Sequence, residues 1–275
     1  MKLHYEPTVR LISHPVIVTP ALNDFLKNET SDKWKLSLGE SYCDQIPEFA
    51  GRLCYMSFDN PRPGGNTKYL ERIKQEGHGS VMEHVNFGVL FTGVSRSMTH
   101  ELVRHRAGTA YSQLSQRYVD ESAAEYVVPW ELRDDVKAGT TVGITWLKSV
   151  RDAHDAYVAT VKQRTETVVA AAKAEKGRNE LTRDEMTTIR KAVRGASRSL
   201  LPNATETKIL VTANVRAWRH MIEKRCHPAA DAEIRLAFHK AYKLLKGYAP
   251  NLFGDYEEVT LEDGTTALTT DTPKV

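Results

Sequence analysis

ELVRHRAGTAYSQLSQRY, residues 101–118, carries three arginines and a histidine, followed by hydroxyl and amide side chains with little aliphatic bulk. Arginine presents a planar fork of donors that matches phosphate and carboxylate oxygens, and Ser, Gln and Tyr add neutral donors and acceptors. The stretch therefore predicts a binding site for a polar anion. The alternative is a positively charged helix end followed by a solvated polar loop.

The residues before this stretch indicate how it is positioned. Apolar residues alternate from 85 to 91, which predicts a strand with one buried face. A helix capped by Ser95 or Ser97 then extends to Val103, delivers Arg104-His105-Arg106 at its C-terminal end, and stops at Gly108. The stretch is thus expected to be a helix end plus a loop.

A turn with two glycines and two histidines, residues 77–84, precedes the strand. His78, Glu83 and His84 are metal ligands by type, but they show no helical i, i+4 histidine pair and no third ligand at a recognisable spacing. We expect no metal here and assign these side chains hydrogen-bonding roles.

The rest of the chain predicts further strands and helices. A helix is expected to start at Pro47, with Phe49, Leu53, Met56 and Cys54 on its core-facing stripe, and Thr67 is a candidate cap for the helix that ends near Gly77. The other expected elements are strands at 9–18 and 205–214 and helices at 145–174, 182–199, 215–225 and 230–248. Thr182 and Glu185 match a capping box, and Arg198 lies at the end of that helix. The segment 256–275 lacks periodicity and is expected to be a flexible tail.

Composition limits the classes of protein that the chain can belong to. The 41% apolar content supports a large core, and the net charge of +3 does not single out nucleic acid or membrane as a partner. Three cysteines without a C-x-x-C pair argue against disulfides and for a reducing, cytoplasmic home. No window has the length of a membrane span, and no Walker A or G-x-G-x-x-G motif is present.

Four motifs in order resemble those of the flavin-dependent thymidylate synthases. Arg104-His105-Arg106 leads through a polar spacer to Ser115-Gln116-Arg117; Gly77 to His84 matches a Gly-His-x-Ser-x-x-Glu-His turn; Arg198 to Pro202 matches Arg-x-x-Leu-Pro; and Asn214 to His220 matches Asn-x-Arg-Ala-x-Arg-His. The resemblance covers roughly residues 45–250. It implies an α/β fold, a single domain over 1–255 with a central mixed or antiparallel sheet flanked by long helices.

The resemblance also implies methylation of dUMP at C5. Methylenetetrahydrofolate would supply the carbon, FAD the hydride, and NADPH would reduce the flavin. A nucleotide monophosphate needs a cationic clamp, and a pyrimidine that accumulates negative charge needs fixed donors. The implied dUMP residues are Glu101, Arg104, Gln113, Leu114, Ser115, Gln116, Arg117, Arg198 and Arg225, of which Arg104, Ser115, Arg198 and Arg225 would be catalytic. The implied FAD residues are His78, Ser80, Arg104, His105, Arg106, Gln113, Asn214, Arg216 and His220. The family's sites form between the subunits of a homotetramer.

The chain departs from the family pattern at three places. Eight residues, not the usual seven, separate Arg-His-Arg from the serine, so the loop near 108–110 holds one extra residue. Gln113 stands where a glutamate is common, and Glu101 where glutamine is common. Ala229 replaces a histidine, while His227 lies two residues earlier and is a candidate substitute.

Three other functions stay open from the sequence. The first is a sister enzyme that methylates or hydroxymethylates UMP or another uridine nucleotide. The second is a non-catalytic nucleotide- or RNA-binding protein, although Tyr111 and Tyr118 alone are weak support for a stacking platform. The third is a methylase that uses Cys226 as its nucleophile.

Overall fold

The computed structural model describes residues 1–275 except 32, 38, 61–62 and 274–275. The chain separates into two compact units. Unit 1 comprises residues 1–7, 92–101 and 113–209, and unit 2 comprises residues 8–91, 102–112 and 210–275.

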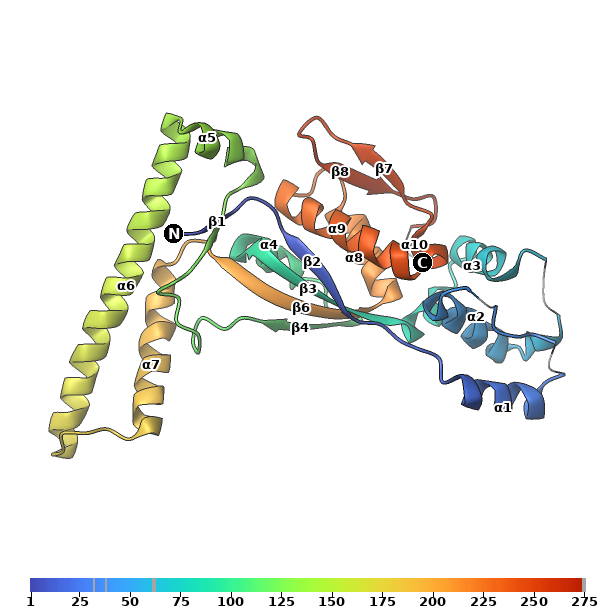
Figure 1. Ribbon diagram of the computed structural model, residues 1–275, viewed down its shortest axis with the longest axis horizontal. Helices are drawn as coiled ribbons and strands as arrows, with labels where there is room; N and C mark the ends of the chain where they lie inside the picture. The colour runs from blue at the N-terminus through green and yellow to red at the C-terminus, as the bar shows by residue number, and fades with distance from the viewer. Residues whose placement is uncertain (32, 38, 61–62, 274–275) are drawn as a thin grey trace. The chain divides into compact units, whose positions relative to one another are not determined.

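The described residues form an α/β protein (Figure 1). Its strands are β1 (Leu3–His4), β2 (Thr8–Ser13), β3 (Asn86–Ser95), β4 (Thr109–Gln113), β5 (Tyr126–Val127), β6 (Glu206–Asn214), β7 (Glu257–Thr260) and β8 (Thr266–Thr269). Its α-helices are α1 (Thr19–Glu29), α2 (Tyr42–Cys54), α3 (Gly65–Gln75), α4 (Arg96–Leu102), α5 (Arg133–Ala138), α6 (Thr141–Lys176), α7 (Arg183–Ser197), α8 (Val215–Arg225), α9 (Ala232–Tyr248) and α10 (Pro250–Phe253).

The main sheet has the strand order β2-β3-β6-β4. Arg96 N donates to Thr205 O at 3.0 Å, and Val215 N donates to Val85 O at 2.9 Å. These two bonds flank opposite ends of the β3–β6 pair, so the two strands run antiparallel. Leu114 N to Lys208 O and Asn214 N to Gly108 O flank β4 and β6 in the same way. The central mixed or antiparallel sheet that the resemblance implied is confirmed.

β4 corrects the prediction of a polar loop after Gly108. The burial of Thr109–Gln113 alternates between half-buried and exposed residues, as in a strand that is covered on one face. The half-buried positions are Thr109, Tyr111 and Gln113, which carry hydroxyl, aromatic and amide groups. A pattern based on aliphatic residues could not detect it.

Unit 1 contains a long helical hairpin, α6 and α7, in which the two helices lie side by side (Figure 1). Thr182 Oγ1 accepts from Glu185 N at 3.3 Å, and Glu185 Oε2 accepts from Thr182 N at 2.8 Å, which confirms the predicted capping box. α7 ends at Ser197, so Arg198 is its C-cap residue as predicted. The hairpin therefore places Arg198 at the rigid end of a helix.

The core of unit 2 fixes α8 and α9. The ring of Phe91 stacks on Phe238 with centroids 5.7 Å apart, and Trp218 lies 6.2 Å from Phe238. All three side chains are fully buried, and Trp218 Nε1 donates to Phe87 O at 3.1 Å. Truncating such an aromatic residue to alanine typically costs about 3–5 kcal/mol. The packing of this core therefore fixes the position of α8, and with it the side chains on the face of α8 that points away from the core.

α2 differs from the prediction. It begins at Tyr42 with Ser41 as its cap, so Pro47 lies inside the helix and does not start it. Its buried face includes polar residues such as Asp44, Glu48 and Arg52, whereas Leu53, Cys54 and Met56 are exposed. The apolar stripe was wrong because this helix buries Glu48 paired with Arg52, and Asp44 as the acceptor of Asn251 N and Leu252 N. Thr67 likewise lies within α3, whose N-cap is Gly64.

The C-terminal segment forms the β7–β8 hairpin and not the predicted structureless tail. Ala267 and Leu268 of β8 are buried, and Asp263 Oδ1 accepts from Thr265 N at 2.8 Å within the turn. Four residues per strand are too few to show a clear sequence period. Among the described residues, no helix is long and apolar enough to cross a bilayer.

Candidate functional site

Arg104-His105-Arg106 follows α4 directly, as the sequence predicted. Ser95 Oγ accepts from Met98 N at 3.0 Å, so Ser95 is the cap that was expected. Gly108 has φ 66°, a left-handed conformation that glycine adopts without steric cost, and the chain turns there into β4. The predicted motif therefore lies in a short turn between a helix and a strand, with Arg104 and Arg106 exposed and His105 half-buried.

His105 is the centre of a group of polar side chains in unit 2. Its Nε2 accepts a hydrogen bond from Arg225 Nε at 2.9 Å, and its ring lies edge-on to His220 with centroids 5.4 Å apart. Partial burial, then the charge of Arg225 and the nearness of His220, lower the pKa of His105 from 6.5 to about 4. The imidazole is therefore neutral at pH 7. Because Nε2 accepts, its proton is on Nδ1.

The turn around His105 is held by its own backbone. His105 O accepts from Thr109 Oγ1 at 2.8 Å and from Tyr111 Oη at 2.6 Å. Gly108 O accepts from Asn214 N at 3.1 Å, and Asn214 Oδ1 accepts from Ala217 N at 2.8 Å to cap α8. A Cβ at Gly108 would lie 2.6 Å from Asn214 Nδ2. This close approach explains why glycine stands here.

The 77–84 turn is connected to α8 in the same unit. Arg216 Nη1 contacts Glu83 Oε1 at 2.7 Å, and both side chains are about half exposed. Ser80 is exposed within the 3-10 helix Gly79–His84, and His78 Nδ1 lies 3.7 Å from Glu76 Oε2. Glu83 thus pairs with an arginine, which agrees with the hydrogen-bonding role predicted for it.

We call Arg104, His105, Arg106, Asn214, Arg216, His220 and Arg225 the His105 cluster; all of its members belong to unit 2. Arg104 and Arg106 are exposed, and neither forms an ion pair with a described residue. Glu83 pairs with one of the cluster's arginines, Arg216. The cluster therefore retains positive charge and free donors, which suits a phosphate-bearing ligand.

The predicted substrate residues 113–117 lie in unit 1. Gln113 Nε2 donates to Thr99 Oγ1 at 2.9 Å, and Leu114 is held at both backbone groups, by Lys208 O at 3.0 Å and by Arg96 Nη2 at 2.7 Å. Ser115 Oγ accepts from Arg117 N at 3.4 Å. The segment leaves β4 in a fixed conformation, with the Arg117 side chain exposed.

Arg198 is exposed in the same unit, at the C-terminus of α7. It forms no ion pair with a described carboxylate, and its charge contributes to lowering the pKa of Arg96, after the larger effect of burial. Glu121 is buried, and burial raises its pKa although the charge of Arg96 opposes the shift. Neither Arg96 nor Glu121 was selected from the sequence.

The structure thus separates the predicted residues. His78, Ser80 and the whole His105 cluster lie in unit 2, whereas Glu101, residues 113–117 and Arg198 lie in unit 1. Ala229 and His227 are the two residues at which the chain departs from the family pattern after α8. Ala229 N donates to His227 Nδ1 at 3.1 Å, a contact within their own turn.

Two other chemistries find little support in the side chains. The described residues contain no group of three or more His, Cys, Asp and Glu side chains able to hold a metal ion. Cys226 is fully buried, which raises the pKa of its thiol far above the usual value. A buried, protonated thiol is a poor nucleophile.

Comparison with known proteins agrees with these motifs. The family described as "Thymidylate synthase complementing protein" matches residues 40–251. A "Flavin-dependent thymidylate synthase" of Mycobacteroides abscessus is 42% identical over 222 residues, covering 80% of this chain and 82% of that protein. One from Mycobacterium bovis is 43% identical over 226 residues, covering 82% and 84%.

Solved structures support the fold. The UMP/dUMP methylase PolB from Streptomyces cacaoi, bound with 5-Br dUMP, gives a TM-score of 0.60 at 16% identity, covering 92% of this chain and 96% of that one. Its complex with 5-Br UMP gives 0.61 at 17% identity, covering 92% and 95%. Taken with the family match over more than half of the chain, the fold and the four motifs show that this protein belongs to the flavin-dependent thymidylate synthase family.

Proposed function

We propose that this protein is a flavin-dependent thymidylate synthase, which methylates dUMP at C5 with methylenetetrahydrofolate as the carbon donor and NADPH as the reductant. The observation that carries the proposal is the His105 cluster, in which a neutral histidine is held by Arg225 among arginines that have spare donors. Family membership supplies the reaction class.

The residues of the His105 cluster fit FAD. The exposed Arg104 and Arg106 supply charged donors for a diphosphate, and Arg216 is paired only through a half-exposed contact with Glu83. His105 offers a neutral N–H at Nδ1, because Arg225 occupies its other nitrogen. His78 and Ser80 complete the proposed flavin set, with Gln113 contributed from unit 1. When bound, FAD would supply the hydride.

The proposed dUMP residues divide between binding and activation. Arg104, Arg117 and Arg225 would bind the nucleotide, with Glu101, Gln113, Leu114, Ser115 and Gln116 beside it. Arg198 would direct its guanidinium at a pyrimidine oxygen and stabilise the negative charge that grows there as C5 becomes nucleophilic. Its position at a helix end suits that task, since the backbone beneath it is fixed.

We propose, as the family resemblance implies, that sites form between subunits of a homotetramer, and that the enzyme works in the cytoplasm. The buried Cys226 takes no part in the proposed reaction.

The test is to purify the protein, record its absorbance spectrum, and assay dTMP formation from dUMP, methylenetetrahydrofolate and NADPH. We expect a yellow protein, NADPH oxidation that depends on dUMP, and dTMP as the product. Turnover of UMP in place of dUMP would assign the alternative uridine methylase. A protein that takes up no FAD would contradict the proposal.

A further inference from the structure

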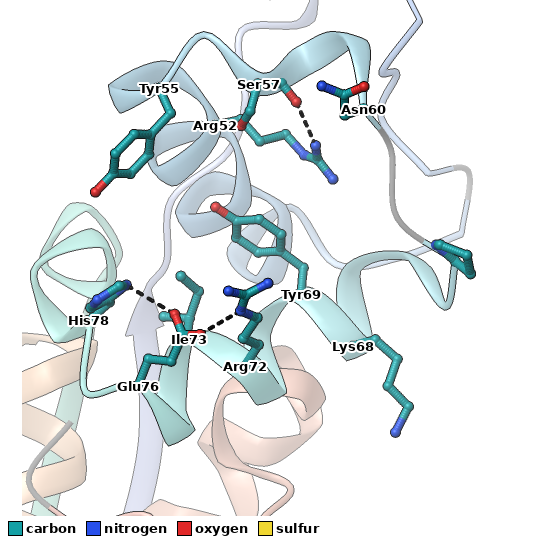
Figure 2. Close-up of a pocket in the computed structure, with 11 residues that line it drawn as sticks. Arg52, Tyr55, Ser57, Asn60, Lys68, Tyr69, Arg72, Ile73, Glu76 and His78 are labelled. Atoms are coloured by element: carbon teal, nitrogen blue, oxygen red, sulfur yellow. Dashed lines mark hydrogen bonds and ion pairs between the residues drawn. The ribbon is translucent and has the colours of Figure 1, made fainter.

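A cavity of about 640 Å³ lies between the C-terminal part of α2 and α3, within unit 2. Figure 2 shows Arg52, Tyr55 and Ser57 on the α2 side and Lys68, Tyr69 and Arg72 on the α3 side. His78, a residue of the proposed flavin set, lines the same cavity. None of the other lining residues belongs to the proposed flavin or dUMP sets, so these two sets do not account for the cavity.

Arg52 is buried at the wall of this cavity, with 4% of its side chain exposed. Its Nε donates to Glu48 Oε1 at 2.8 Å and its Nη1 donates to Ser57 O at 2.9 Å. Within the described part of the chain, the Nη2 atom of Arg52 has no hydrogen-bond partner. This atom is accessible to solvent. A guanidinium held on two sides thus keeps one free donor for the cavity.

Tyr69 gives the cavity an aromatic wall. The guanidinium carbon of Arg52 lies 5.0 Å from the Tyr69 ring centroid. A Cβ at Gly51 would lie 2.3 Å from Tyr69 Oη, so the absence of a side chain at Gly51 is what lets Tyr69 lie against α2. Tyr55, with 80% exposed, adds a second aromatic ring at the opening.

Two further cations line the opening, each paired with a carboxylate. Arg72 Nε donates to Glu76 Oε1 at 2.6 Å, and Lys68 Nζ donates to Glu71 Oε2 at 2.6 Å. These side chains are about half exposed or more, and such surface pairs contribute little net free energy. A carboxylate of a ligand can therefore replace the glutamate at low cost.

We propose that this cavity binds the p-aminobenzoyl-glutamate tail of the folate co-substrate. The inference rests on the proposed function and goes beyond it by naming where the tail lies. A flat benzoyl group suits the tyrosine wall, and glutamate carboxylates suit the fork of Arg72 and the free donor of Arg52. His78 lines one end, so a pterin attached to this tail extends toward the proposed flavin residues.

The nicotinamide dinucleotide fits the cavity less well. Its 2′-phosphate is a dianion and would have to displace two glutamates at once, because each of the three cations of the lining is paired with a carboxylate. A singly charged carboxylate of the ligand would replace a single glutamate at one cation. The cavity is therefore assigned to the folate.

The experiment measures binding of p-aminobenzoyl-triglutamate to the FAD-loaded protein by calorimetry, and so needs no turnover. Arg72→Gln should weaken binding about tenfold, the loss expected for one charged hydrogen bond. Tyr69→Leu should weaken it as well. The control is Arg178→Gln, an arginine of similar exposure that is paired with Glu185 on the α6–α7 hairpin, and it should leave binding unchanged.

Kinetics separate the two ligands. In Arg72→Gln the KM for polyglutamylated methylenetetrahydrofolate should rise, while the KM values for NADPH and dUMP stay at the wild-type value. Unchanged fragment binding in both cavity variants would overturn the assignment, and a rise confined to NADPH would transfer the cavity to the reductant. Failure of the wild-type protein to make dTMP would instead overturn the proposed function, which fragment binding does not test.

Discussion

Arg225 Nε donates to His105 Nε2 across 2.9 Å and joins residues that are 120 positions apart in the chain. The bond connects the C-terminal end of α8 to the Arg-His-Arg turn, and it fixes the tautomer of the histidine. Both residues were assigned to ligands from the sequence, but to different ones. The structure adds that they contact each other directly, so a change at either residue affects both proposed binding functions.

Replacing Arg225 by Gln should raise the pKa of His105. Burial is the largest cause of the depression, and the charge of Arg225 is the next. The wild-type imidazole should titrate near pH 4, and the variant at a higher pH. NMR of 15N-labelled histidine measures this, with Arg216→Gln as a control on the same helix. An unchanged His105 pKa in Arg225→Gln would show that the contact is not formed in solution.

The depressed pKa of His105 has a consequence for stability. Its folded-state pKa, about 4, lies below the ordinary value of 6.5, so the unfolded chain binds a proton first as the pH falls. The contribution of His105 to stability is full above pH 6.5 and is lost as the pH falls toward 4. Urea unfolding between pH 7 and pH 4.5 should show this loss in the wild type and less of it in His105→Gln.

Gly108→Ala should impair flavin binding more than a glycine replacement elsewhere. The new Cβ would displace Asn214 Nδ2 and weaken the cap on α8, at a cost of about 1 kcal/mol in addition to the strain of the left-handed backbone. Gly139→Ala is a matched control, because Gly139 also has φ 66° but a Cβ there meets nothing within 4 Å. FAD titration of both variants measures the difference. Equal FAD affinities would mean that the Gly108 turn does not shape the site.

Arg104→Ala and Arg198→Ala should each lower kcat/KM for dUMP. Loss of a charged, two-pronged contact removes about 2–4 kcal/mol of transition-state stabilisation, roughly a thirty- to thousandfold fall. Thermal stability should change little, since both side chains are exposed. Arg164→Ala, another exposed arginine, serves as the control.

The same two variants test whether sites are shared between subunits. Mixing inactive Arg104→Ala and Arg198→Ala proteins under subunit exchange should restore part of the activity, because some sites would then contain both wild-type arginines. No recovery despite demonstrated exchange would place both arginines in one chain's site.

Asp255→Asn should destabilise the protein strongly. Asp255 accepts from the fully buried Arg219 at 2.8 Å and from the buried Lys74 at 2.8 Å, and these charges lower its pKa despite burial. Leaving buried cations without their partner typically costs about 3–5 kcal/mol. Asp152→Asn, which breaks the exposed pair with Lys148, should cost about 0.5 kcal/mol or less. Urea denaturation compares them, and similar losses in the two variants would contradict the account.

The sequence predicted those elements whose apolar pattern is long or whose cap is explicit. β6, α8 and the capping box at Thr182 were found because aliphatic runs and capping residues are local signals. β4 was missed because the strand is polar, and the start and buried face of α2 were predicted wrongly because the helix buries polar residues, including the pair of Arg52 with Glu48. The burial of Asp44 depends on Asn251 and Leu252, whose backbone N–H groups donate to it from a distant part of the chain.

The candidate site shows the same limit. The Arg-His-Arg turn and the α8 residues were identified from motifs, yet their mutual contact depends on where α8 packs. Arg96 holds the Leu114 carbonyl, and Tyr111 holds the His105 carbonyl, but no sequence spacing marks either contact. The sequence also did not indicate that the predicted residues are divided between two units, because the proposed flavin and dUMP sets each use segments from several parts of the chain.

A single-turnover reaction tests the central claim most directly. The flavin of the purified protein is reduced without oxygen, NADPH is removed, and dUMP with methylenetetrahydrofolate is added while flavin absorbance and dTMP are followed together. The account predicts that the flavin becomes oxidised as dTMP appears, with one dTMP formed for each flavin. Formation of dTMP while the flavin stays reduced, or oxidation of the flavin without dTMP, would contradict it.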